Sequence, residues 1–195
     1  MRASALFATL ALCGSLLVGA QTAKPVLKVA ADGLPAGHAT PEGAACDLAR
    51  AFITHNPTLF KSTCIKPFGS PTIKKQFQTF YTTTAQQMIQ EGRRSTPSPG
   101  GPKTIGKLFA ARSLSRDGPA SAGYAVFDFH DIKFVDIGVI LYNGQRVMNR
   151  TMVIQTANGS WYVDPIPGAL PLLSMGLNQE SASTQDFTQA YTIKH

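Results

Sequence analysis

Five side chains are the candidates for chemistry in this sequence, because each stands in an apolar stretch. They are Tyr81, Asp131, Asp136, Arg150 and Trp161. A carboxylate and a tyrosine that face one pocket can act as an acid–base pair. An arginine on an apolar face needs a carboxylate partner or a ligand, because burying its charge alone is very costly. The residue types therefore favour either proton-transfer chemistry or ligand binding.

Motifs that identify other chemistries are missing from the sequence. It contains no HExxH, GxSxG, GxGxxG, P-loop or histidine cluster, so metal, hydrolase and nucleotide sites have no support. We expect neither a metal nor a cofactor. Asp128 and His130 share one face of a predicted strand, while Phe127 and Phe129 are typical of its core side. The Asp128–His130 pair is therefore expected to point outward.

The stretch 133–166 predicts the elements that position most of these candidates. It contains three runs rich in Val, Ile, Tyr and Trp, separated by Asn143-Gly144 and Asn158-Gly159. Asn-Gly between strand-like runs is the strongest short-range hairpin signal, because both central residues of a type I′ turn need φ > 0. The sequence therefore predicts a three-stranded antiparallel meander with two-residue turns.

Two-residue turns determine which residues of the meander face each other. The first turn places Arg150 opposite Ile137, and the second places Ile154 opposite Val163. The surface expected to pack against the helices comprises Val135, Ile137, Val139, Leu141, Met148, Met152, Ile154, Trp161 and Val163. Arg150 lies among them, and two alternatives stay open for it. It binds an anionic or carbonyl group of a ligand, or it turns outward at a β-bulge or into a structural ion pair.

The opposite face of the meander is also rich in apolar residues. It comprises Phe134, Ile140, Tyr142, Val147, Val153 and Tyr162, with Asp136, Asn149 and Thr151 among them. A face of this composition is unusual for contact with solvent alone. It predicts an association surface such as a homodimer interface, with Asp136 on it.

Helical patterns precede the meander. Thr40-Pro41 begins a first helix, Asn56-Pro57 ends it and a short second helix follows, and Ser70-Pro71 begins a longer helix that ends at Gly92. Tyr81 lies on the apolar face of the long helix, where it either packs in the core or places its hydroxyl in a pocket. A Pro- and Gly-rich loop follows, and then two predicted strands, 104–115 and 121–132, joined by a turn.

The amino-terminal residues have the pattern of a secretory signal peptide. Arg2 precedes an apolar run from Ala5 to Leu17, and small residues lead to an expected cleavage after Ala20. We therefore expect a secreted or periplasmic protein without a membrane span. Its net charge is +7, but the basic residues are scattered, so no nucleic-acid surface is predicted.

Export leaves Cys46 and Cys64 in an oxidising compartment, where an even pair of cysteines predicts a disulfide. The alternatives are a cysteine nucleophile or a metal pair, and neither has a CxxC spacing or a nearby histidine in its support.

Two segments of the chain carry a resemblance to a known family. The run TPEGAACDLARAFITHNPTLF and the closing meander that ends in SWYVDPI resemble the nuclear-transport-factor-two-like superfamily, which includes SnoaL-like and ketosteroid-isomerase-like proteins. The resemblance covers roughly residues 40–167 and rests on the order of elements. It implies a cone-shaped pocket between sheet and helices, and dimerisation through the outer face of the sheet.

These observations predict an α+β protein in which amino-terminal helices pack on a strongly bent antiparallel sheet, a cone-like barrel, in a single domain. The expected divisions are a signal peptide (1–20), a tether (21–39), the cone domain (40–167) and a carboxy-terminal segment and tail (168–195). The leading functional hypothesis is a non-enzymatic module that binds a small apolar or weakly acidic ligand through Arg150, Tyr81 and Trp161, or that dimerises. The alternatives are a SnoaL-like isomerase, cyclase or hydratase using Tyr81 with Asp131 or Asp136, and a structural component of the cell envelope.

Overall fold

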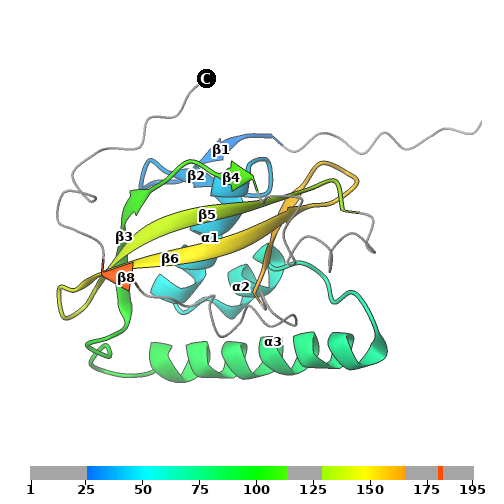
Figure 1. Ribbon diagram of the computed structural model, residues 1–195. Coiled ribbons are helices and arrows are strands. Elements are labelled where there is room, and N and C mark those ends of the chain that lie inside the picture. The colour runs from blue at the N-terminus through cyan, green and yellow to red at the C-terminus, as the bar shows by residue number, and fades with distance from the viewer. Residues whose placement is uncertain (1–25, 114–128, 166–179, 182–195) are drawn as a thin grey trace, which may run out of the picture.

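The computed structural model describes residues 26–113, 129–165 and 180–181, and within them the chain has an α+β fold (Figure 1). The helices are α1 (Pro41–Ile53), α2 (Pro57–Thr63) and α3 (Pro71–Gly92). The strands are β1 (Lys28–Val29), β2 (Pro35–Ala36), β3 (Pro102–Leu108), β4 (Arg112–Ser113), β5 (Asp131–Leu141), β6 (Arg146–Gln155), β7 (Trp161–Asp164) and β8 (Glu180–Ser181). The predicted signal peptide and most of the predicted strand 121–132 lie outside these residues.

Each helix begins with a capping side chain followed by proline. The hydroxyl of Thr40 accepts a hydrogen bond from a backbone N–H in the first turn of α1, and the side chains of Asn56 and Ser70 do the same for α2 and α3. Proline follows each cap, where its missing N–H leaves no helical bond unmade. The predicted starts of the three helices are confirmed, and α3 ends at Gly92 as expected.

The main sheet is antiparallel with the order β3–β5–β6–β7, while β4 adds to β5 and β8 adds to β6. The predicted strand 104–115 is interrupted: β3 ends at Leu108 and β4 begins at Arg112. In Figure 1, α1 lies behind β5 and β6, and α3 runs along one side of the sheet. Among the described strands the sheet does not close into a barrel. The α+β class is therefore confirmed, and the cone-like closure stays a prediction.

The two predicted hairpins form, but their turns have three residues instead of two. Leu141 donates its N–H to the carbonyl of Gln145, and the N–H of Gly144 returns to the carbonyl of Leu141. Gly144 has φ +84, whereas Asn143 is not among the described residues with positive φ. This is a type I turn followed by a glycine bulge, and the second hairpin repeats it with Gly159. The predicted type I′ geometry was wrong.

One additional loop residue shifts the register of both hairpins by one position. Asn149 lies opposite Ile137, and Arg150 lies opposite Asp136. In the second hairpin Val163 lies opposite Val153 rather than Ile154. Because side chains alternate along a strand, a shift of one residue moves every side chain of β6 to the other face relative to β5. The predicted pairings were wrong for this reason.

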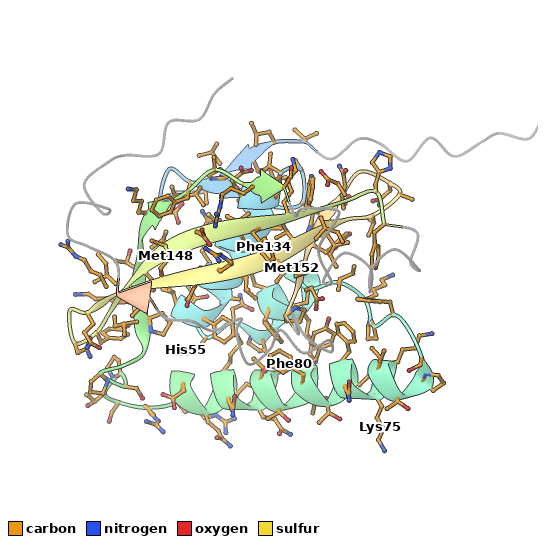
Figure 2. All side chains as sticks on the ribbon, in the orientation of Figure 1. His55, Lys75, Phe80, Phe134, Met148 and Met152 are labelled. Carbon is orange, nitrogen blue, oxygen red and sulfur yellow. The ribbon has the colours of Figure 1, made fainter. Side chains whose placement is uncertain are left out.

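Both faces of the sheet are covered by apolar groups of the chain. Val135, Ile137, Val139, Val147 and Val153 pack with Ala44, Ala45 and Cys46 of α1. On the other face, Met152 and Ile154 pack with Ile65 and Phe77, and Phe134 and Tyr162 lie against them. Figure 2 shows Phe134, Met148 and Met152 on the same side of β5 and β6. Packing within the chain therefore accounts for Phe134 and Tyr162 of the face that we assigned to a dimer interface, whereas Tyr142 of that face is 41% exposed.

The described part of the predicted tether is a hairpin fastened to α1 by Arg50. β1 and β2 pair around a turn at Asp32-Gly33. The Arg50 guanidinium donates to both carboxylate oxygens of Asp32 (2.9 and 2.7 Å), to Asp47 (2.7 Å) and to the carbonyls of Leu34 and Pro35. The sequence predicted a tether here. The hairpin is short, and the arginine that holds it lies in α1, so no pattern within the hairpin itself indicated that it would be ordered.

Replacement of Arg50 tests this fastening. We expect Arg50→Met to lower the free energy of unfolding by about 1–3 kcal/mol, because the part-buried acceptors of Asp47, Leu34 and Pro35 lose their donor. Arg50→Lys should recover only part of this loss, because one ammonium cannot reach all of these acceptors. Urea unfolding followed by circular dichroism measures the effect. Arg94→Met is the control, because Arg94 is 56% exposed and pairs with Glu91 on the surface; an equal loss in the control would contradict the fastening.

The stabilisation from the contact between Arg50 and Asp32 depends on pH, and the direction of this dependence follows from the pKa of Asp32. Burial raises the pKa of the Asp32 carboxyl, but the hydrogen bond from Arg50 and the other local bonds lower it more, so its pKa lies below the ordinary value. The stabilisation is therefore present above the unfolded-state pKa and is lost as the pH falls through the folded-state pKa. We expect the difference between the wild type and Arg50→Met to narrow below about pH 4. A constant difference from neutral to acidic pH would contradict this assignment.

Replacement of Gly144 tests the turn that sets the register. A Cβ at Gly144 meets nothing within 4 Å, so Gly144→Ala isolates the strain of φ +84, which is worth about 1–2 kcal/mol for a residue other than glycine. Gly100→Ala is the matched control, because its Cβ also has open space and its φ is not in the left-handed region. Urea midpoints should fall for Gly144→Ala and stay or rise slightly for Gly100→Ala; equal midpoints would contradict the turn geometry.

Candidate functional site

A cavity of about 390 Å³ lies between the helices and the sheet. Most of its wall is apolar. The helices contribute Ala45, Leu48, Ala49, Phe52, Phe60 and Phe80, and Figure 2 shows Phe80 above α3, on the side of the sheet. The sheet contributes Ile137, Val139, Leu141 and Val147. Apolar side chains of α1 therefore form one side of this cavity.

Polar side chains form a strip along another part of the cavity wall. They are Thr84 and Gln87 of α3, and Asn149 and Thr151 of β6. Within the part of the chain that the structure describes, the side chains of Thr84, Gln87, Asn149 and Thr151 make no hydrogen bond to the protein. We call these four residues the polar strip. Their side chains can therefore bond a molecule in the cavity.

The shifted register decides which residues of β6 reach this cavity. Asn149 and Thr151 share the face of Ile137 and Val135, which is the face toward α1. Arg150 also touches the cavity, but its guanidinium lies on the other face. The expected apolar partner Ile137 is replaced by Asp136. Two amide and hydroxyl side chains therefore line the cavity where the sequence predicted an arginine.

Arg150 and Asp136 form an ion pair with Arg112. The Nε of Arg150 lies 2.8 Å from one carboxylate oxygen of Asp136, and the guanidinium of Arg112 lies 2.5 Å from the other. Asp136 is 13% exposed and Arg150 is 50% exposed. This is the structural ion pair that we left open as an alternative. It forms because the register places Arg150 opposite Asp136, and no bulge at Arg150 is involved. Asp136 is not among the residues that line the cavity.

The remaining predicted candidates are bound elsewhere in the fold. Asp131 accepts a hydrogen bond from the N–H of Ile132 and lies 3.7 Å from the ammonium of Lys133. Tyr81 donates its hydroxyl to the carbonyl of Ile65, and burial raises the pKa of this phenol. Neither residue lines the cavity.

Trp161 is buried against α1 and also does not line the cavity. Its N–H donates to the carbonyl of His38 (2.8 Å), and its own carbonyl lies 2.7 Å from Nδ1 of His38. The His38 ring stacks on Tyr162 with 4.4 Å between centroids. His38 therefore bonds the backbone of Trp161 at the edge of β7. The side chain of Trp161 packs in the core.

Asp164 is the site residue that the sequence reasoning missed. Asp164 is 2% exposed, and it lines the cavity at the end of β7. Its charge acts on Cys64 and Tyr81, and it has further interactions within the chain. The available signal was a carboxylate directly after Trp161-Tyr162-Val163 and before Pro165. A charged residue inside such an apolar strand needs a specific environment.

Cys46 and Cys64 are buried free thiols in the structure. Cys46 packs in the cluster that contains Val163, and Cys64 pairs with the backbone of Val163. Both therefore lie near β7, but no disulfide joins them. The predicted Cys46–Cys64 bond stays a prediction.

Thiol labelling tests the state of these cysteines. Burial raises the pKa of Cys46 to about 12, and burial raises the pKa of Cys64 further. In the folded protein we expect iodoacetamide to label neither at about pH 8, because the thiolate is the reactive form. Peptide mapping separates them from Cys13, and rapid native labelling would contradict their burial. After unfolding without reductant, two free thiols take up label and a bonded pair takes up none.

Two kinds of feature are absent from the described residues. No group of three or more His, Cys, Asp or Glu side chains there is arranged to hold a metal ion. None of the described helices combines the length and the apolar character that a membrane crossing requires. Comparison of the chain with protein-family models, with curated proteins and with solved structures gave no match.

Proposed function

We propose that this protein binds a small, largely apolar molecule in the cavity between α1, α3 and the sheet. The observation that carries the proposal is a largely apolar cavity of about 390 Å³ in whose wall the side chains of Thr84, Gln87, Asn149 and Thr151 make no hydrogen bond within the described part of the chain. Small-molecule sites are typically concave, of about 300–1,000 Å³, mostly apolar, and oriented by a few polar groups. The cavity has all of these properties.

The walls of the cavity indicate how such a ligand would lie. Its apolar body would contact Leu48, Phe52 and the alanines of α1, and its polar groups would face Asn149 and Thr151. The sequence suggested a weakly acidic ligand because it placed Arg150 inside. The pairing of Arg150 with Asp136 removes the reason for that choice. We therefore propose an apolar ligand with hydrogen-bonding groups at one end or edge.

The architecture is compatible with the resemblance drawn from the sequence. Helices α1 to α3 precede an antiparallel sheet, and a cavity lies between them. We propose on this basis a nuclear-transport-factor-two-like, cone-shaped single domain. Export after Ala20, a Cys46–Cys64 disulfide and dimerisation through the sheet belong to the same proposal. The apolar run from Ala5 to Leu17 supports the export.

A second candidate is an enzyme that moves a proton in this cavity, as in the SnoaL-like alternative. The observation that favours it is the buried carboxylate of Asp164 in the cavity wall. Asp131 and Asp136, which the sequence suggested as bases, do not line the cavity. An enzyme would convert a bound molecule and lose this conversion in Asp164→Asn, whereas a binding protein would return its ligand unchanged. Mass spectrometry of the bound and released molecule separates the two.

Filling the cavity tests the binding proposal directly. Ala49 lines the cavity and is partly buried, so Ala49→Phe would occupy the space that the ligand needs. We expect the neutral probe naphthylmethanol to bind the wild type. In Ala49→Phe the larger side chain takes up part of the cavity, so the affinity for this probe should fall about tenfold or more. Isothermal titration calorimetry measures the dissociation constants, and native mass spectrometry reports any molecule retained during purification.

Ala110→Phe is the control for this substitution. Ala110 is exposed, lies between β3 and β4, and does not line the cavity. The same change of side chain there should leave probe binding unchanged. No binding to the wild type, or equal binding to Ala49→Phe and the wild type, would contradict the proposed site.

A further inference from the structure

The polar strip of the cavity consists of uncharged groups. It offers the hydroxyls of Thr84 and Thr151 and the amides of Gln87 and Asn149, and within the described part of the chain these side chains bond no protein group. A hydroxyl can both donate and accept a hydrogen bond, and a side-chain amide has an NH₂ donor and a carbonyl acceptor. The strip can therefore bond a hydroxyl, carbonyl or amide group of a ligand, and it brings no charge to the contact.

The two hydroxyls of the strip open into the cavity. Thr84 is 6% exposed and Thr151 is 8% exposed, so both residues are buried. Among the described residues, however, the hydroxyl of Thr63 is the one side-chain polar atom that is both fully enclosed and unpaired. The unpaired oxygens of Thr84 and Thr151 therefore keep contact with open space, and the cavity is the space that both residues line. A ligand that completes these hydrogen bonds would be favoured, because buried polar groups are normally paired.

The charged residues at the cavity lie apart from the β6 residues of the strip. Arg150 and Asp164 line the cavity. Asp164 lies opposite Met152, so it shares a face of the sheet with Arg150, whereas Asn149 and Thr151 lie on the other face. Both charged residues also have interactions within the chain. An ion beside the polar strip would therefore give up part of its hydration and gain bonds to neutral groups alone, which is costly.

We propose that the cavity selects uncharged ligands that carry a hydroxyl, carbonyl or amide group on an apolar body, and that it discriminates against both carboxylates and amines. The polar strip supplies the hydrogen bonds, and the apolar wall contacts the body. This inference rests on the proposed function, because it names the ligand class of the same cavity. It runs against the charge of the whole chain, which is +7 and attracts anions at long range.

Three probes with one ring system and different polar groups test the selectivity. They are naphthylmethanol, which is neutral, naphthylmethylamine, a cation at neutral pH, and naphthoate, an anion. We expect the full chain to bind naphthylmethanol about tenfold or more tighter than either charged probe, because only the charged probes have to leave an ion's hydration behind. Isothermal titration calorimetry measures all three dissociation constants in the same buffer.

Removal of single hydroxyls tests the role of the polar strip. Valine has nearly the shape of threonine without its hydroxyl, so Thr84→Val and Thr151→Val remove a hydrogen-bonding group and keep the space of the cavity. We expect the affinity for naphthylmethanol to fall about two- to tenfold in at least one of them. The urea midpoint of both variants should stay or rise, because neither hydroxyl bonds the described part of the chain. A structural role of the hydroxyls would lower it.

Thr63→Val is the matched control for these variants. Thr63 is buried and its hydroxyl is also unpaired, but it does not line the cavity. Its replacement should leave the affinity for naphthylmethanol unchanged. Unchanged affinity in both Thr84→Val and Thr151→Val, or an equal loss in Thr63→Val, would overturn the role of the polar strip.

The order of the three probes in the wild type decides the selectivity even if a variant does not fold. Naphthoate or naphthylmethylamine binding as tightly as naphthylmethanol overturns the inference while the binding function stands. Failure of all three probes overturns both.

Discussion

In three hairpins of this protein, an Asp or Asn side chain accepts a hydrogen bond from the N–H two residues further on, and the glycine between them takes a left-handed backbone. The pairs are Asp32-Gly33, Asn143-Gly144 and Asn158-Gly159. The side-chain bond favours a type I turn, and the glycine completes it as a bulge. Each loop therefore has three residues. The registers between β5 and β6 and between β6 and β7 follow from the last two of these loops.

Register in turn decides where charge and polarity lie. With this register Arg150 meets Asp136 and Arg112 on one face, where all three side chains keep some contact with water. Asn149 and Thr151 come to the other face, at the cavity. A shift of one residue would place a guanidinium among apolar side chains and leave Asp136 without Arg150, which is costly. The ion pair and the turns therefore favour the same arrangement.

The helices determine the space that the sheet leaves. Ala45 and Ala49 of α1 face the cavity with short side chains, whereas Phe77 of α3 fills the packing on the other face of the sheet. Arg50 holds the β1–β2 hairpin against the far side of α1. The N–H of Ala111 bonds the carboxylate of Glu42, which connects the start of α1 to the segment between β3 and β4. The position of α1 is therefore fixed by contacts outside the cavity. Side chains do not have to fill the cavity to hold α1 in place.

Local patterns were sufficient for much of the fold. Thr40-Pro41 and Ser70-Pro71 predicted helix starts because capping and proline act within one turn of the chain. The two Asn-Gly pairs predicted hairpins, and alternation predicted the buried face of β5. The core-side position of Phe129 was also correct, since it packs near Phe68 and Phe77. All of these signals act between residues that are close in sequence.

The candidate site could not be predicted in the same way. Asn-Gly is compatible with a two-residue and a three-residue turn, and the difference decides whether the side chain of Arg150 or those of Asn149 and Thr151 lie on the face of the sheet toward α1. Asp164 becomes a cavity residue only because β7 ends beside α3 and the segment after α2. The sequence by itself determined the elements and their order, through interactions within a few residues. Only the tertiary structure decided which polar groups share the cavity, because that depends on register and on contacts between distant parts of the chain.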